Sequence, residues 1–215
     1  QDPVAIAAPR LVLQQGANPL IVAGPHLPGE DGLLLNYTGE NQGLGERGCY
    51  NRLQMAQDVA GVHGACWMAR RQAVLDAGGL DEANAPLFQA VADLGYRLQQ
   101  AGHRLVWTPH ANALHAGGTT LRAVRRDPAL ALALSQSGMD EVRRLRDRWV
   151  GFAGQHPLYS KHLSGRRAYA LDTGMVNSWS LDFQARPRVL ALPLRSGSGQ
   201  YRVIEPLDGL QMRSM

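Results

Sequence analysis

The chain has 215 residues, of which 45% are hydrophobic and 19% are charged, a balance that allows a buried core and excludes wholesale disorder. The net charge of +4 comes mostly from scattered arginines. The sequence lacks the interleaved basic and aromatic residues that stack on bases, so a nucleic-acid-binding function is disfavoured. No apolar run reaches the length of a membrane-spanning helix, and Cys49 and Cys66 show neither metal-site spacing nor the density of a disulfide scaffold.

The first third of the chain is predicted to form short strands and turns. Residues 4–13, 20–24 and 33–38 are apolar and are separated by proline and glycine, which is typical of strands joined by turns. Residues 41–58 are polar and contain glycine, so a loop is expected there. The small apolar residues of 59–70 predict a further strand.

Two helices are predicted next, each ended by glycine. The first covers residues 70–77 and stops at Gly78-Gly79, because a helix C-terminus commonly needs the left-handed backbone that glycine adopts. The second covers residues 93–101, where the apolar residues recur with a helical period before Gly102. Residues 103–109 are predicted to form a strand closed by Pro109, and residues 112–118 another.

A longer helix is predicted from Asp127-Pro128, which is a favourable helix start. Its second half is amphipathic, and its arginines form either a solvated face, which the pattern favours, or an anion site. The sequence pattern changes again near residue 184, where a domain boundary is predicted. The predicted organisation is therefore residues 1–126 as the main α/β part, 127–184 as a helical extension, and 185–215 as a linker and the start of a second domain.

An ordered set of short motifs resembles the C-terminal half of the catalytic domain of family 2 glycosyltransferases, which have the GT-A fold. The set covers roughly residues 1 to 180, and no single motif in it is specific. Its members, in order, are Gly64-Ala65, Arg70-Arg71, Gly78-Gly79-Leu80-Asp81-Glu82, Asp93-Leu94, Arg97-Leu98, Ala101-Gly102-His103-Arg104, Pro109, Ala111 and His115. The segment "HPLYSKHLS" further resembles one that follows this domain in large bacterial polysaccharide glycosyltransferases, and residues 186–207 resemble the first strand and loop of a GT-B-like domain.

The resemblance implies the fold and the reaction. The fold expected is α/β: the C-terminal half of a Rossmann-like mixed sheet with flanking helices, followed by a helical tail and the start of a second domain. The reaction expected is transfer of a sugar from a nucleotide-sugar donor to a glycan or a lipid-linked acceptor, in bacterial cell-surface polysaccharide synthesis. Such transfer uses a divalent metal, Mg²⁺ or Mn²⁺, at the diphosphate and a base that deprotonates the acceptor hydroxyl.

The candidate substrate-binding residues each have a structural alternative. Gly78 and Gly79 let backbone approach a sugar ring, whereas Asp81 and Glu82 either bind sugar hydroxyls or cap the next element. The remaining candidates are Trp67, which offers a flat face to a sugar or packs in the core, Arg97 of the helix motif, and His115, which matches the family's metal-site histidine or is structural.

The chain departs from the family at the expected base. The acidic pair that precedes Asp93 in the family is replaced by Ala90 and Val91, neither of which can accept a proton. Asp93 is therefore the candidate catalytic residue, and its structural alternative is an acid at the N-cap or in the first turn of the helix, favoured by the helix dipole. No Asp-x-Asp turn for the metal occurs in the chain.

Two functional hypotheses follow. The chain is either the acceptor-side half of a glycosyltransferase, expected to be inactive without the donor-binding half that the family places upstream, or a degenerate glycosyltransferase-like domain that serves as a binding or scaffold module. In both cases a cytoplasmic location is expected, with room for peripheral association with the inner membrane. Binding to nucleic acid is not expected.

Overall fold

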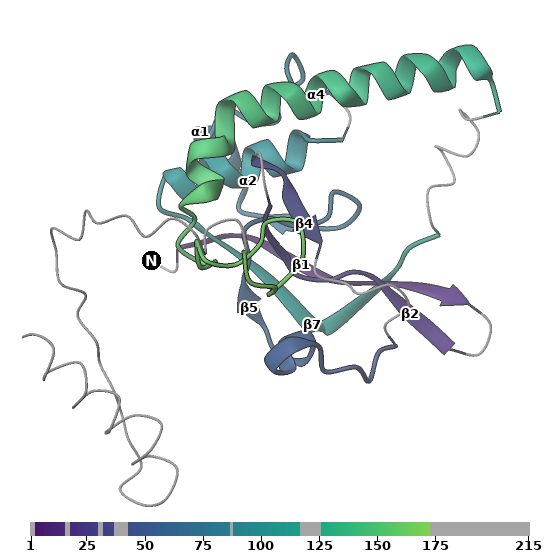
Figure 1. Cartoon of the computed structure of the whole chain (residues 1–215), viewed down its shortest axis with the longest axis vertical. Helices are drawn as coiled ribbons and strands as arrows, with labels where there is room; N and C mark the ends of the chain where they lie inside the picture. The colour runs from purple at the N-terminus through teal and green to yellow at the C-terminus, as the bar shows by residue number, and fades with distance from the viewer. Residues whose placement is uncertain are drawn as a thin grey trace, which may run out of the picture. The chain divides into compact units, whose positions relative to one another are not determined.

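The computed structural model describes residues 3–15, 18–29, 32–36, 43–86, 88–116 and 126–172 (Figure 1). These residues form a mixed α/β structure with a curled sheet and a few helices, which confirms the predicted fold class at this level. The predicted linker and second domain at 185–215 and the last part of the helical extension lie outside the described residues. None of the described helices is long and apolar enough to cross a membrane.

The main sheet has five strands and is built around two long ones. β1 (Val4–Gln15) and β7 (Arg104–Leu114) pair in parallel. The other strands are antiparallel to their neighbours: β2 (Asn18–Ala23) and β6 (Met68–Ala69) pair with opposite halves of β1, and β5 (Gln57–Asp58) pairs with β7. A separate two-stranded sheet joins β3 (His26–Pro28) to β4 (Leu34–Asn36).

Proline does not end either long strand, which corrects the prediction of two strands at 103–109 and 112–118. β7 runs through Pro109, and β1 runs through Pro9. The register between the two strands shifts at this point, because Pro9 pairs with Thr108 and Arg10 pairs with Asn112. A proline lacks the N–H of a ladder bond and is tolerated where a bulge already interrupts pairing.

Two further predictions for the first half are wrong in detail. The expected strand at 59–70 is mostly loop, and only its end, β6, joins the sheet. The expected loop at 41–58 contains the 3-10 helix η2 (Cys49–Gln54) and strand β5. Val59 nevertheless enters the core, since its side chain is 1% exposed and its N–H bonds to the carbonyl of Leu105.

The helices stack on one face of the sheet, in Figure 1 above β1 and β7. α1 (Arg71–Asp76) ends at Gly78 and Gly79, whose φ angles of 84° and 71° are the left-handed values that glycine allows. α2 (Ala90–Gln100) begins three residues before Asp93. α4 (Pro128–Gly154) begins after Asp127, whose carboxylate accepts the N–H groups of Ala129 and Leu130 and so confirms the predicted start.

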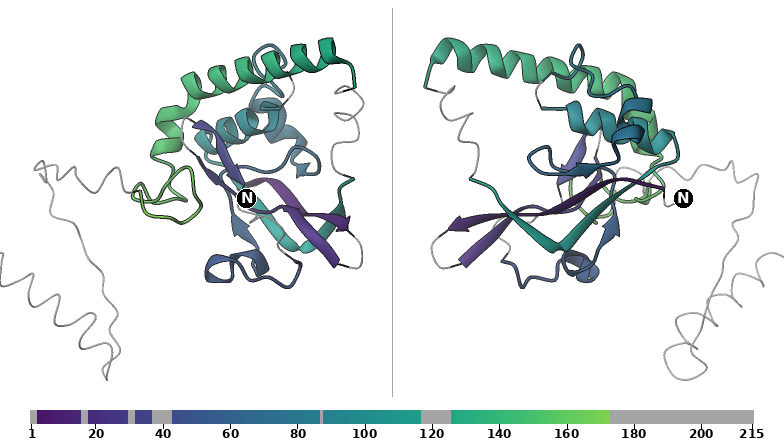
Figure 2. Two further views of the ribbon diagram at one scale, coloured as in Figure 1. Left: turned by 45° about the vertical axis from the view of Figure 1, so that its right-hand side comes forward. Right: turned by 180° about the vertical axis from the view of Figure 1, so that it is seen from behind.

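Helix α2 lies between the sheet and α4, as the three views agree (Figures 1 and 2). On one side Leu94 and Leu98 pack into the main core with residues of β1, β2 and β7. On the other side Tyr96 packs with Leu145 and Trp149 of α4. Both faces of α2 are buried, so this helix positions the motif residues that it carries.

Candidate functional site

Four of the predicted substrate-binding residues line one depression. Gly78, Asp81, Glu82 and Arg97 surround an open hollow of about 340 Å³ beside Arg148 of α4. The first three lie on the turn after α1, and Arg97 comes from α2. Local sequence placed the glycines at the end of α1, but only the packing of α2 and α4 against this turn brings the arginines to it.

Arg97 fixes the turn. Its guanidinium donates to the carbonyls of Ala77 and Gly79, the second at 2.8 Å, and its Nε lies 2.8 Å from Oδ2 of Asp93. A cation on the free carbonyls at a helix C-terminus is favourable, because these groups carry the negative end of the helix dipole. Arg97 therefore has a structural role, and its predicted contact with substrate would be additional to it.

Asp81 caps the turn. Its carboxylate accepts the backbone N–H of Asn84 at 3.1 Å and the side-chain amide of Asn84, and it lies 3.2 Å from Nη1 of Arg148. Hydrogen bonds from Asn84, and then the positive charges of Arg148 and Arg97, hold the pKa of Asp81 below its usual range. Asp81 is thus an ionised, occupied acceptor, whereas the neighbouring Glu82 is exposed at the hollow.

Asp93 is buried at 3% exposure and joins three donors. Oδ1 accepts Nε1–H of Trp149 at 2.7 Å and lies 3.1 Å from Nη1 of Arg148, while Oδ2 accepts Nε–H of Arg97. The guanidinium of Arg148 also lies over the Trp149 ring, 5.1 Å from its centroid. These contacts match the structural alternative, an acid in the first turn of α2. The catalytic role of Asp93 stays a prediction.

The first two residues of α2 are not acidic. Ala90 and Val91 are half-buried, and Val91 packs against the main core. A carboxylate nevertheless caps this helix, because Oε2 of Glu141 in α4 accepts the N–H groups of Phe88 at 2.7 Å and Gln89 at 3.0 Å. Glu141 is fully buried, so its position suits a cap that favours the positive end of the helix dipole.

The two aromatic and imidazole candidates lie apart from the hollow. Trp67 is half-buried and packs against the main core, which matches its structural alternative. His115 follows β7, and its ring meets that of His63 edge-on with centroids 5.6 Å apart. His63 in turn lies 6.2 Å from His26.

The histidines do not form a ready metal site. Across the residues that the structure places, no group of three histidine, cysteine, aspartate or glutamate side chains is arranged to hold a metal ion. Burial, and then the neighbouring His115, lowers the pKa of His63, which keeps its ring neutral and able to act as a ligand. The predicted Mg²⁺ or Mn²⁺ site at His115 stays a prediction.

The sequence did not assign to the site three residues of α4 that complete it: Glu141, Arg148 and Trp149. Their partners lie more than 50 residues away in the chain, so no local pattern predicts the contacts. One signal was present for Glu141. It precedes the buried Leu145 by four residues and so places a charge on the apolar face of the helix, where an unpaired acid is costly.

The comparisons with known proteins show similarity without showing a family. No protein-family model matches the chain. Over 133 residues, or 62% of its length, the chain is 27% identical to the uncharacterized protein y4gI of Sinorhizobium fredii (strain NBRC 101917 / NGR234). The matched stretch covers 14% of that protein. No solved structure matches the chain.

Proposed function

We propose that the chain is the acceptor-side half of a GT-A-type glycosyltransferase domain. In the complete protein it serves the transfer of a sugar from a nucleotide-sugar donor to a glycan or lipid-linked acceptor of the bacterial cell surface. The protein is located in the cytoplasm or is peripherally bound to the inner membrane. A divalent metal binds the diphosphate of the donor.

One observation supports this proposal above the others. The glycine-rich turn Gly78–Glu82 and the helix motif Asp93–Arg97, which the resemblance pairs in sequence, are joined in space by Arg97 around an open hollow. Carboxylates and guanidinium groups are hydrogen-bonding partners for sugar hydroxyls. In this hollow Glu82 is the exposed acid, because Asp81 already accepts from Asn84 and Arg148.

Glu82→Gln is expected to weaken sugar binding about tenfold, since a hydrogen bond to a charged group contributes about 1.5 kcal/mol. Binding of the methyl glycosides of glucose, galactose, mannose and rhamnose is measured by saturation-transfer NMR on the 215-residue chain. Glu46→Gln makes the same change at another exposed glutamate and should leave affinity unchanged. An absence of binding by all four glycosides, or equal affinities for the two variants, would overturn the assignment of the hollow.

A second candidate function is favoured by the contacts of Asp93. Its carboxylate is buried and is held by Arg97, Arg148 and Trp149, and the positions of the usual acidic pair are Ala90 and Val91. We infer that, if this half supplies no base, it acts as a glycosyltransferase-like binding module. It then holds a sugar without carrying out the transfer.

If the second candidate function is correct, an acidic residue at the position of the missing base should restore sugar transfer. In a longer protein that joins this chain to a donor-binding half, Val91→Asp is expected to raise the rate of sugar transfer about 100-fold over Val91→Asn, which has the same shape without a base. Release of the nucleoside diphosphate measures the rate. Transfer by the unaltered protein at the rate of Val91→Asp would rule the binding-module candidate out.

A further inference from the structure

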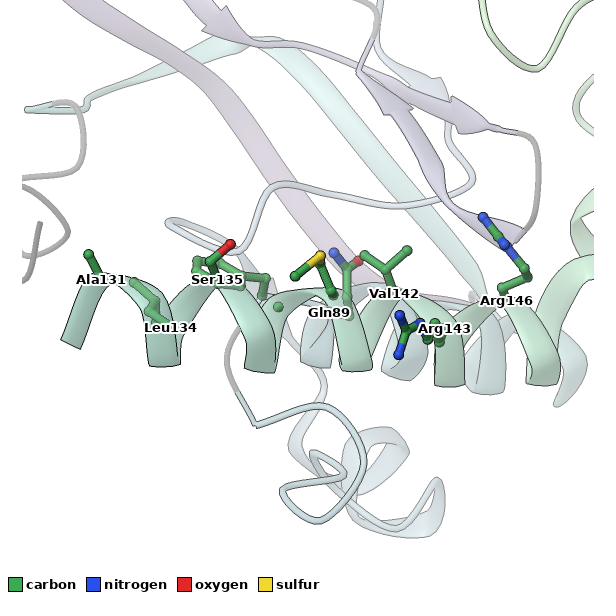
Figure 3. Close-up of a pocket in the computed structure, with 10 residues that line it drawn as sticks. Gln89, Ala131, Leu134, Ser135, Val142, Arg143 and Arg146 are labelled. Carbon is green, nitrogen blue, oxygen red and sulfur yellow. The ribbon is translucent and has the colours of Figure 1, made fainter. Parts of the chain in front are cut away.

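A second, larger hollow lies beneath the first half of α4, between that helix and the start of α2 (Figure 3). Its volume of about 640 Å³ is within the range of small-molecule sites. The side chains that line it are mostly apolar or small and come from α4, with Phe88 and Gln89 opposite. None of the predicted site residues belongs to it.

The hollow exists because the two helices differ in length. α4 has 27 residues and α2 has 11, which at 1.5 Å per residue corresponds to roughly 40 Å and 16 Å. The second half of α4 buries Leu145 and Trp149 against α2. The same helical face continues towards the start of α4 as Val142, Gly138 and Leu134, which line the hollow. Figure 1 shows that the first half of α4 extends beyond α2, and the contact of Glu141 with Phe88 and Gln89 places this overhang past the start of α2.

Phe88 forms the opposite wall and is held there by two residues of α4. The buried carboxylate of Glu141 accepts its N–H. Its ring lies so close to Gly138 that a Cβ added at that glycine would meet two ring carbons at 3.2 Å. The glycine therefore permits the approach of the ring, which leaves Phe88 46% exposed along the hollow.

One end of the hollow is positively charged. Arg143 and Arg146 lie at this end, and Ala131 and Leu134 lie at the other (Figure 3). Arg143 pairs with Asp140 at 3.2 Å, but both side chains are exposed, at 72% and 49%. Such a surface pair contributes little stability, so its guanidinium can exchange partners for a better anion.

We propose that this hollow binds a single-chain lipid phosphate, with the chain against Phe88, Leu134 and Val142 and the phosphate on Arg143 and Arg146. The apolar lining and the arginines at one end match the two parts of such an amphiphile. The identification of this amphiphile as a lipid-linked acceptor rests on the proposed function. Binding itself does not require transfer or the sugar hollow, so the two can fail separately.

The test uses decyl phosphate below its micelle concentration and isothermal titration calorimetry on the 215-residue chain. Saturable binding is expected, with at least tenfold weaker binding of inorganic phosphate and of decyltrimethylammonium, which has the same chain and the opposite charge. Equal binding of inorganic phosphate would reduce the site to an anion site, and equal binding of decyltrimethylammonium would reduce it to a non-specific apolar surface. Either result overturns the proposal.

Variants separate the two parts of the site. The double variant Arg143→Gln/Arg146→Gln should bind decyl phosphate at least tenfold more weakly. Arg47→Gln changes an exposed arginine outside the hollow and should leave the affinity unchanged. Gly138→Leu should fill the hollow and weaken binding to a similar degree, and Leu134→Gln tests the same wall if that variant fails to fold. Unchanged affinity in the arginine variant or in the folded wall variant contradicts the proposal.

Discussion

Asp93→Ala is expected to lower the free energy of unfolding by about 3–5 kcal/mol, the usual cost of removing one partner from a buried ion pair. The carboxylate is 3% exposed and accepts from Arg97, Trp149 and, at 3.1 Å, Arg148. Its removal leaves the Trp149 indole N–H buried without this acceptor, and it takes the shared carboxylate from the guanidinium groups of Arg97 and Arg148. Urea unfolding followed by tryptophan fluorescence measures the change.

The matched control is Asp76→Ala. Asp76 is exposed at the end of α1, where its carboxylate accepts from Gln72, so its removal should cost less than about 0.5 kcal/mol. Asp93→Ala and Arg97→Ala should also be strongly non-additive, because each removes the same contact. A loss below 1 kcal/mol for Asp93→Ala would contradict the structural role and would favour the catalytic one.

The helices could be predicted because their signals are local. The Asp127-Pro128 start of α4 and the Gly78-Gly79 end of α1 each depend on a few adjacent residues whose backbone preferences the structure reproduces. The amphipathic half of α4 was predicted for the same reason, since Leu145 and Trp149 recur at helical spacing and are buried.

The strands were harder, because pairing is decided by distant residues. Pro109 has the local signature of a strand end, yet β7 continues past it because the partner strand β1 has its own proline and register shift at the same level. Residues 59–70 have the composition of a strand, but one edge of β1 is paired with β7 and the second half of its other edge is paired with β2. Only Met68 and Ala69 reach a free part of its edge.

The candidate site divides in the same way. The turn Gly78–Glu82 and Arg97 were identified from motifs, and the structure brings them together. What Asp93 does could not be predicted, because its partners Arg148 and Trp149 lie more than 50 residues further along the chain. Two of the three contacts to this carboxylate therefore depend on the docking of α4, a property of the packed fold.

Acidification from pH 7.5 to pH 5 is expected to destabilise the protein by about 2 kcal/mol for each of two buried histidines. Burial lowers the pKa of His26 and of His156 to about 4. Both rings have neutral partners: Nδ1 of His26 lies 3.1 Å from the carbonyl of Gly24, and Nε2 of His156 lies 2.7 Å from Oε1 of Gln99. Nδ1 of His156 also accepts the N–H of Leu158.

The direction follows from where the protons bind. Between pH 6.5 and pH 4 the unfolded chain protonates these histidines and the folded chain does not, so stability is complete above pH 6.5 and falls as the pH drops towards 4. The lowered pKa of Asp81 acts at more acidic pH and does not enter this window. His156→Gln should remove about 2 kcal/mol of the loss in urea unfolding at the two pH values, and it should leave the shares of His26 and of His63, whose pKa burial also lowers. The exposed His110→Gln should keep all of the loss. Equal stability at pH 7.5 and pH 5 would show that neither ring is held neutral, and α4 would then lack the neutral contact that fixes its C-terminal end to α2.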